Sequence, residues 1–486
     1  MFKPRTCRAM LLALPLFSAP ALAAESADLK ALKEEIARLR NSYESRINAL
    51  EQRLVQAETT VAQAKAGASQ AEASAVKAEN SAAAANAVAS AASVRPSSEA
   101  AFNPAVSLIL SGMYTNLKDN TNKRPYAING FVPSNGEVTP PARGFSLGES
   151  ELMVAANVDQ VFRGQMTLSL PPEEGASPVV EEGFIQTLGL SNGLNLKAGR
   201  FLSGIGYMNE QHSHAWDFSD APLAYKAFFG GQQKGEGVQL KWLAPTDTFL
   251  EFGVEGGKGG SFPSTDRNKN GFTTGSLFAH VGDDIGTDHS WRAGLSYTSS
   301  QPRNRSYDDV DANDVATTNT FNGSSKTWIL DGVWKWAPNG DPSQRYLKMQ
   351  GEYFSRRENG SLTCADKDAA TATNCTGGVN GSLDSRQSGW YAQAVYKFAP
   401  TWRTGYRYDR LDYGSVNIGG ALNAADLPVL ARHNPSRNTV MVDWSPSEFS
   451  LVRLQYARDS SRTGSPDDQI WVHYIVSLGA HGAHKY

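Results

Sequence analysis

The sequence predicts an all-β transmembrane barrel of about 16 antiparallel strands, preceded by an α-helical coiled coil. Three observations support this fold class. The spacing of apolar residues changes from a heptad pattern before residue 95 to strict alternation after residue 103. The connections between successive alternating segments are alternately short and long. Apolar runs near the ~20 residues that a membrane helix needs are absent, which excludes a helical membrane protein.

Composition narrows the range of functions. The chain has 486 residues and a net charge of −3, and its Lys and Arg residues are scattered. Nucleic acid is therefore not an expected partner, because such proteins concentrate positive charge. Mean hydropathy is −0.40, which does not argue against a barrel, since only half of each strand is apolar.

Residues 1–23 have the features of a signal peptide. Basic Lys3, Arg5 and Arg8 precede an apolar run, and Ala21-Leu22-Ala23 forms a small-x-small cleavage site. We therefore expect export, with Cys7 lost at cleavage. Cys364 and Cys375 remain in one polar stretch of an exported chain, so we expect them to form a disulfide. A metal pair is the alternative, which the lack of a nearby His in the sequence disfavours.

Residues 24–95 are predicted to be a coiled-coil extension. Between residues 28 and 93 there is no Pro and one Gly, and apolar residues recur at alternating steps of three and four, beginning with Leu29, Leu32 and Ile36. A single helix cannot bury such a seam, so we expect an oligomer. A flexible Ala-rich linker is the alternative after Gly67. Residues 96–104 are predicted to be a linker.

Residues 105–486 are predicted to be the barrel. Residues 390–398 and 402–409 show the alternation, with Trp and Tyr on one face and polar residues on the other. Short turns are expected near 158–160, 191–193, 244–247, 282–288, 338–342, 399–401 and 445–447. Long external loops are expected near 117–143, 171–178, 201–235, 257–271, 300–325, 358–386, 413–436 and 460–467. This pattern predicts a water-filled lumen and places both barrel ends, with the coiled coil, in the periplasm.

The third long loop is predicted to fold into the lumen and narrow it, because it is rich in aromatic residues. Its expected constriction residues are Glu210, His212, His214, Trp216, Asp217 and Asp220. Imidazole and carboxylate groups suit zinc, so Glu210, His212, His214 and Asp217 form a candidate metal site. This hypothesis assumes an extended segment in which both His side chains point the same way. The alternative is that the His side chains make hydrogen bonds that hold the loop.

Charged residues on the polar faces of the strands are expected to line the lumen and to set ion preference. They are Arg163, Lys241, Arg292, Lys335, Arg403, Arg407, Arg453, Glu251, Asp331 and Asp409. Both signs are nearly balanced, so the preferred sign of ion does not follow. Neither a His-Glu-x-x-His motif nor a phosphate-binding loop occurs, and no nucleophile and base are expected to converge. We therefore expect no enzyme and no cofactor, with zinc considered only as a transported ion.

The combination of signal peptide, heptad extension and barrel resembles trimeric porins with an N-terminal coiled coil, such as the dicarboxylate-type channels and the phosphate-selective porin O and P group. Four segments, at 199–201, 209–218, 242–247 and 477–485, are similar to a proteobacterial family labelled zinc-regulated TonB-dependent outer-membrane receptor. That resemblance implies zinc uptake and covers most of residues 103–486.

True TonB-dependent receptors carry a plug domain before the barrel, and the heptad region leaves no room for one here. We therefore expect passive diffusion of small solutes or metal ions across the outer membrane of a Gram-negative bacterium, with lipid around the barrel. Two alternatives are a plugless receptor for metal uptake and a structural tether whose coiled coil contacts peptidoglycan.

Overall fold

The structure is a computed structural model of the chain, and it divides into two units, residues 1–99 and 100–486. It describes residues 34, 35, 38, 40, 52, 56, 104–118, 127–134, 138–171, 175–265 and 270–479. The predicted signal peptide and most of the predicted coiled coil and linker therefore lie outside the described residues. The described residues of the first unit are helical and exposed.

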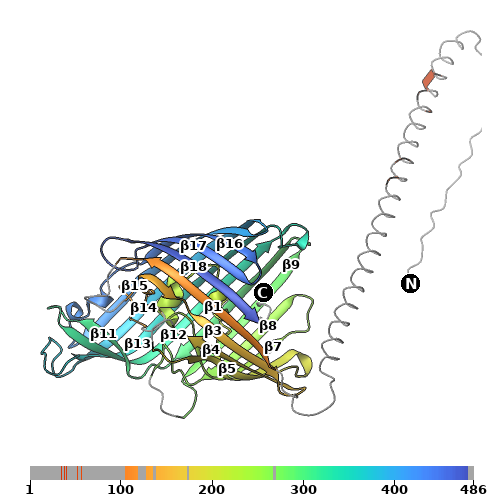
Figure 1. The fold of residues 1–486 in the computed structure, drawn as a ribbon. Coiled ribbons are helices and arrows are strands. Elements are labelled where there is room, and N and C mark those ends of the chain that lie inside the picture. Colours follow the sequence, from red (N-terminus) through yellow and green to blue (C-terminus); the bar gives the residue numbers. More distant parts are fainter. Residues whose placement is uncertain are drawn as a thin grey trace, which may run out of the picture. The chain divides into compact units, whose positions relative to one another are not determined.

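The second unit is a single antiparallel sheet (Figure 1). Its strands are β1 (Ala105–Asn116), β2 (Gly144–Leu147), β3 (Ser150–Asn157), β4 (Phe162–Leu170), β5 (Val179–Thr187), β6 (Leu194–Leu202), β7 (Lys234–Leu243), β8 (Phe249–Gly257), β9 (Thr274–Ile285), β10 (His289–Ser300), β11 (Arg305–Val310), β12 (Ala316–Trp336), β13 (Tyr346–Asp366), β14 (Val379–Ala399), β15 (Trp402–Gly420), β16 (Ser436–Ser447), β17 (Ser450–Asp459) and β18 (Asp467–Gly479). Among the described residues, no helix has the length and apolar character needed to cross a membrane.

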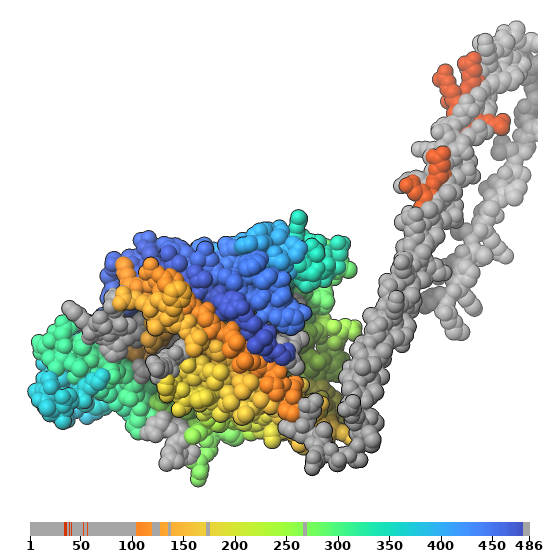
Figure 2. All heavy atoms as spheres, in the orientation of Figure 1, coloured from red at the N-terminus to blue at the C-terminus, as the bar shows by residue number. Residues whose placement is uncertain are grey.

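The sheet closes into a barrel with sixteen strand positions, as the sequence predicts. The sheet has 18 strands, but two pairs of them share one position each. β2 and β3 pair with successive parts of β1, and β10 and β11 pair with successive parts of β12. Sixteen positions around the barrel remain. β1 pairs with β18, from Ser107 opposite Gly479 to Asn116 opposite Ile470. In Figure 2 these two strands, coloured orange and dark blue, lie side by side. Closure leaves no sheet edge in the barrel wall, as a membrane-spanning sheet requires.

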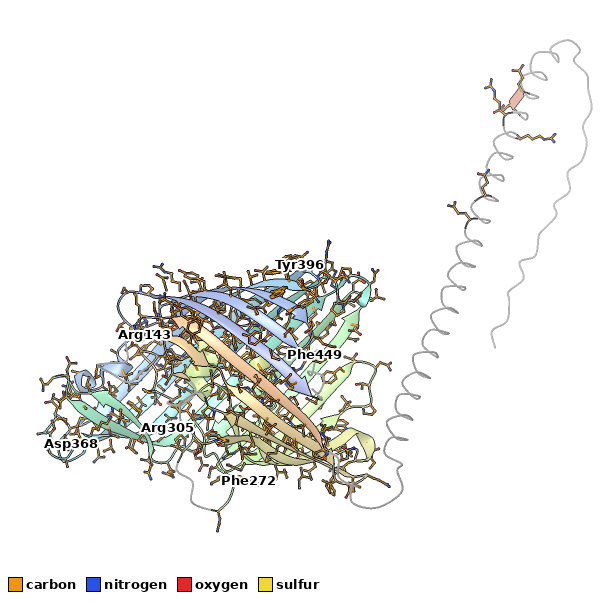
Figure 3. The ribbon with its side chains drawn as sticks, viewed as in Figure 1. Arg143, Phe272, Arg305, Asp368, Tyr396 and Phe449 are labelled. Atoms are coloured by element: carbon orange, nitrogen blue, oxygen red, sulfur yellow. A yellow bond between two sulfur atoms is a disulfide. The ribbon has the colours of Figure 1, made fainter. Side chains whose placement is uncertain are left out.

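An apolar belt surrounds the barrel. On β12, Trp328 and Leu330 are 53% and 58% exposed, whereas the next residue, Asp331, is 4% exposed and faces inward. Neighbouring strands repeat this alternation, and Figure 3 shows Tyr396 on the outer face of the wall. Outward-facing aromatic residues form one row at Tyr297, Trp328, Tyr353, Trp390 and Tyr408, and a second row at Tyr396, Trp402 and Trp444. Two aromatic rows around an apolar belt are typical of a membrane-spanning barrel.

Four strands are much longer than the sequence analysis expects. β12, β13 and β14 have 21 residues each and β15 has 19, so the loops predicted at 300–325, 358–386 and 413–436 are wrong in part. The segment Trp328–Trp336 alone matches the ~9–11 residues that cross a membrane, so the rest of β12 extends beyond the belt. Its outward residues there are Ala316, Thr318, Thr320, Asn322, Ser324 and Lys326, so the large apolar residues whose alternation identifies a strand are missing.

The extended strands have their own apolar core. Phe321, Leu362 and Leu383 are fully buried there, and they pack with Leu427 and Leu430 around a short 3-10 turn at Pro428–Leu430. Cys364 and Cys375 belong to this cluster and form a disulfide with an S–S distance of 2.00 Å. It lies at the base of the β13–β14 connection, whose tip carries the labelled Asp368 (Figure 3).

The turns at the opposite end of the barrel are short, as predicted. Three of them are shorter than expected, because β9 continues to Ile285, β14 to Ala399 and β16 to Ser447. Others are longer, including the two that follow β5, which ends at Thr187, and β12, which ends at Trp336.

The other 3-10 turns in the part of the chain that the structure describes are Ser191–Gly193, Ser213–Ala215, Pro338–Gly340 and Ala424–Asp426.

Candidate functional site

The connection between β6 and β7, residues 203–233, lies inside the barrel. It contains the helix α2 (Leu223–Phe229), in which every residue is buried. Pro222 precedes the helix, and Gly230 ends it in the left-handed conformation with φ of 68°. Pro favours a helix start and Gly a left-handed helix end, so the local sequence fixes the length of this helix.

One side of α2 packs against the wall formed by β12–β15. The Tyr225 ring lies 5.0 Å from that of Phe354, and Phe228 lies 5.9 Å from Phe131 of the first long loop. Tyr391 and Leu411 complete this apolar cluster and are almost fully buried. The cluster fills the lumen on this side, so any passage must run along the other side of the loop.

Buried Glu352 on β13 anchors the start of the loop. Its carboxylate accepts hydrogen bonds from the backbone N–H groups of Tyr207 and Met208 at 3.2 and 3.1 Å. It also accepts from the Tyr225 hydroxyl at 2.9 Å. Gly206 makes this approach possible, because its φ is +64° and a Cβ there would lie 2.3 Å from Glu352 Oε2.

Two loop aspartates hold the far side of the loop. Asp217 contacts Lys348 and Arg403, both at 2.9 Å. Asp220 contacts Arg437 at 2.9 Å and Arg407 at 3.1 Å, and it also pairs with Lys226 of the loop. Burial alone would raise the pKa of both carboxyls, but the surrounding cations outweigh it and hold each pKa well below its usual range.

The charges predicted to face the lumen all occupy inward-facing positions of the strands. They are Arg163, Lys241, Arg292, Lys335, Arg403, Arg407, Arg453, Glu251, Asp331 and Asp409. Most of these side chains contact the loop or one another. Arg403 and Arg453 both contact Asp443, and Lys241 contacts Glu210 of the loop at 2.8 Å.

The structure does not assemble the four candidate metal ligands. Glu210 pairs with Lys241, and Asp217 pairs with Lys348 and Arg403. Among the described residues, the side chains whose ligand atoms lie close enough to share an ion are instead Glu151, Glu181 and His212. The expected extended segment is also wrong, because Ser213–Ala215 is a 3-10 turn. Trp216 follows this turn, and its indole N–H donates to the carbonyl of Gln211.

His212 and His214 instead face three carboxylates of the wall. His212 Nδ1 lies 3.1 Å from Glu151 Oε2 and 3.3 Å from Glu181 Oε2, and His212 Nε2 lies 2.9 Å from Glu182 Oε2. His214 Nδ1 lies 3.0 Å from Glu151 Oε1. Burial disfavours protonation of the His212 ring, but the three carboxylates outweigh burial and raise its pKa well above the usual range. We call these five residues the His–Glu cluster.

A β-bulge brings two consecutive glutamates into this cluster. Thr167 on β4 pairs with Glu182, and the next residue, Leu168, pairs with Val180, so Glu181 is an extra residue. A bulge re-aims side chains, and Glu181 and Glu182 are both buried on the inner side. Strict alternation would send one of them outward, which is why sequence analysis did not find this pair.

A cavity of about 730 Å³ lies beside the cluster. The loop forms one side and strands β16–β18 and β1–β5 form the other. Its lining combines apolar residues, such as Met113, Leu147 and Trp216, with the polar and charged residues Glu181, Ser213, His214, Lys234, Arg437 and His473. This is the part of the lumen that the loop leaves free.

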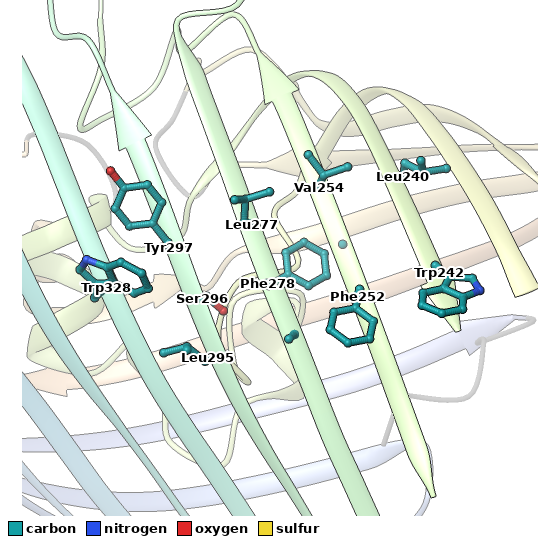
Figure 4. Close-up of a pocket in the computed structure, with 12 residues that line it drawn as sticks. Leu240, Trp242, Phe252, Val254, Leu277, Phe278, Leu295, Ser296, Tyr297 and Trp328 are labelled. Atoms are coloured by element: carbon teal, nitrogen blue, oxygen red, sulfur yellow. The ribbon is translucent and has the colours of Figure 1, made fainter. Parts of the chain in front are cut away.

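A second hollow, of about 480 Å³, lies on the outer wall over β7–β10 and β12 (Figure 4). Leu240, Trp242, Phe252 and Trp328 line it. Phe278 forms its floor behind Gly253, where a Cβ would lie 2.0 Å from the Phe278 ring. Because this hollow is apolar and belongs to the membrane-facing belt, it is not part of a polar passage.

The pentapeptide 189–193 has the Gly-x-Ser-x-Gly spacing of serine hydrolases, and the expectation from the sequence that this motif is absent was wrong. It forms the exposed turn between β5 and β6, with Ser191 opening a 3-10 turn. The motif needs a sharp strand-to-helix elbow to present its serine, and that context is not present at these residues.

Comparison with known proteins places the chain in a family. An uncharacterized protein of Aquifex aeolicus (strain VF5) is 31% identical over 419 residues, which are 81% of this chain and 82% of the relative. The chain belongs to the same family as this protein. No family model matches the sequence.

Several solved outer-membrane proteins are similar in structure. A loop-deletion mutant of OmpT of Vibrio cholerae has 11% identity and a TM-score of 0.47, over 77% of this chain and 99% of that one. The outer membrane channel DcaP of Acinetobacter baumannii has 11% identity and a TM-score of 0.46, over 79% and 99%. The anion-selective porin of Comamonas acidovorans has 10% identity and a TM-score of 0.42, over 77% and 99%. These likenesses are too weak to support a conclusion about this chain.

Proposed function

We propose that this protein is an outer-membrane channel of the porin type, through which small solutes or ions diffuse. One observation carries the proposal. A closed barrel with an apolar belt holds a loop inside it, and the loop leaves a charged cavity of about 730 Å³ along one wall. A barrel of about sixteen strands is wide enough for an aqueous passage. The anchored loop then sets the size and charge of what passes.

Three further features belong to the same proposal. The heptad seam between residues 28 and 93 favours a homotrimer, because its apolar residues need partner helices. Ala105 and Gly479 lie at the end of the barrel that carries the short turns, which supports a periplasmic location for the predicted coiled coil in a Gram-negative bacterium. Transport is passive, and the transported solutes include metal cations.

Conductance of the purified full-length protein in planar lipid bilayers tests the proposal. We expect insertion to produce ohmic current in groups of three equal steps, one for each barrel of a trimer. Addition of the protein without current steps, although the barrel is folded by circular dichroism, would contradict a channel and would favour a receptor or a structural tether. Single steps of one size would retain the channel and contradict the trimer.

A further inference from the structure

We propose that Glu151, Glu181 and His212 bind a divalent transition-metal cation of the zinc class at the wall of the lumen cavity. Binding of the ion at this site does not depend on the proposed channel. Only the further step, that the constriction selects this class of ion for passage, rests on the proposed function. The ligand set differs from the one that the sequence predicts, which included Glu210 and Asp217.

The ligand atoms are already spaced for one ion. Oxygens of Glu151 and Glu181 lie 3.1 and 3.3 Å from His212 Nδ1, and atoms of all three residues lie within 4.8 Å of one another. Four ligands at ~2.0–2.1 Å around a tetrahedral zinc ion are separated by about 3.3 Å. A cation can therefore enter with small side-chain movements, and neither strand needs to shift.

The surrounding contacts match those of a metal-binding imidazole. When Nδ1 of a His binds a metal, its other nitrogen usually donates to a carboxylate, which fixes the ring. His212 Nε2 lies 2.9 Å from Glu182 Oε2, which supplies that contact. His214 Nδ1 is 3.0 Å from the second oxygen of Glu151 and so orients this carboxylate.

Charge and access also favour a cation. The three carboxylates of the His–Glu cluster carry more negative charge than one proton on His212 and the ammonium of Lys234, which lies 3.4 Å from Glu181, can offset. Buried charges of one sign are costly without compensation. Glu181 and His214 line the cavity, so an ion reaches the site from the lumen and water completes its coordination.

Metal binding to the full-length protein in detergent tests the site. After treatment with a chelator, Co²⁺ is added and the visible absorption of four-coordinate cobalt is followed, and Zn²⁺ affinity is measured by calorimetry. We expect one ion per chain in the wild type. Glu181→Gln keeps the shape of the side chain and should lower Zn²⁺ affinity by at least about 10- to 100-fold, because loss of a group that only hydrogen-bonds to a metal ligand already costs that much.

Glu251→Gln is the matched control. Glu251 also contacts a His, with its Oε1 3.1 Å from His280 Nδ1, but it lies outside the His–Glu cluster. Equal Zn²⁺ affinity in the wild type and Glu181→Gln, or no bound ion in the wild type, would overturn the site. Loss of affinity in Glu181→Gln alone would support it. If the protein binds Zn²⁺ but does not conduct in bilayers, the site stands and the channel proposal fails, which separates the two.

Discussion

Asp220→Asn should release the loop from the barrel wall. The substitution keeps the size of the side chain but removes the negative charge that Arg407, Arg437 and Lys226 share. Asp220 is 8% exposed, and both Arg side chains are about 2% exposed or less, so these cations stay buried with one carboxylate fewer, Arg407 keeping Asp409 and Arg437 keeping Asp459.

Breaking a buried ion pair by removing one partner costs about 3–5 kcal/mol. With RT near 0.59 kcal/mol, this cost raises the equilibrium population of the opened loop roughly 150- to 5,000-fold, because the ion pairs that hold the loop on the wall are lost. The barrel wall itself loses no strand pairing, so the effect should stay in residues 203–233.

Amide hydrogen exchange of the detergent-solubilised protein measures this opening. We expect protection of α2 to fall by at least about 100-fold, while protection of β12–β15 stays unchanged. Asp384→Asn is the control, because Asp384 is an exposed carboxylate paired with exposed Arg357 and far along β14 from the loop. A fall in α2 protection of less than about tenfold would show that the ion pairs do not hold the loop.

Three more predictions concern the loop and the extended strands. Phe228→Ala should destabilise the loop by about 3–5 kcal/mol, because it opens a void in the apolar cluster, and exchange should report this, whereas the exposed Phe272→Ala should change little. Reduction of the Cys364–Cys375 disulfide should speed proteolysis between residues 367 and 378 and leave heat resistance of the barrel unchanged, as gel mobility would show. The two loop aspartates have pKa values below the ordinary value of 3.8, so their stabilising contribution is complete above pH 3.8 and is lost as the pH falls below it. Channel current should accordingly be steady from pH 7 to about pH 4 and become noisy only below it, and noise that begins near pH 6 would contradict this assignment.

The barrel was largely predictable from the sequence because the outer face of its wall contacts lipid, whereas the inner face contacts water and polar side chains. Residues 390–398 and 402–408 alternate between lipid-facing aromatic residues and inward-facing polar residues, and the structure confirms this phase in both strands. Where the medium is water on both faces, the signal disappears. This explains why the sequence predicts loops for the parts of β12–β15 that extend beyond the apolar belt, although these parts continue the same strands.

The candidate site was predictable only in its location. His212 and His214 identify the loop, but their partners come from β3 and β5, which are distant in sequence and are joined to the loop only by the closed barrel. The bulge at Glu181 leaves no local signature in the sequence. The coiled coil and the trimer remain predictions, because they depend on residues outside those that the structure describes.

The bulge in β5 also has an evolutionary consequence. Because Glu181 is an extra residue between two paired positions, deletion of its single codon would restore regular pairing of β4 and β5 and would leave the rest of the barrel in register. The same deletion would remove one carboxylate from the lumen. The number of carboxylates in this lumen can therefore change with the length of the chain, without any substitution at the residues that build the wall.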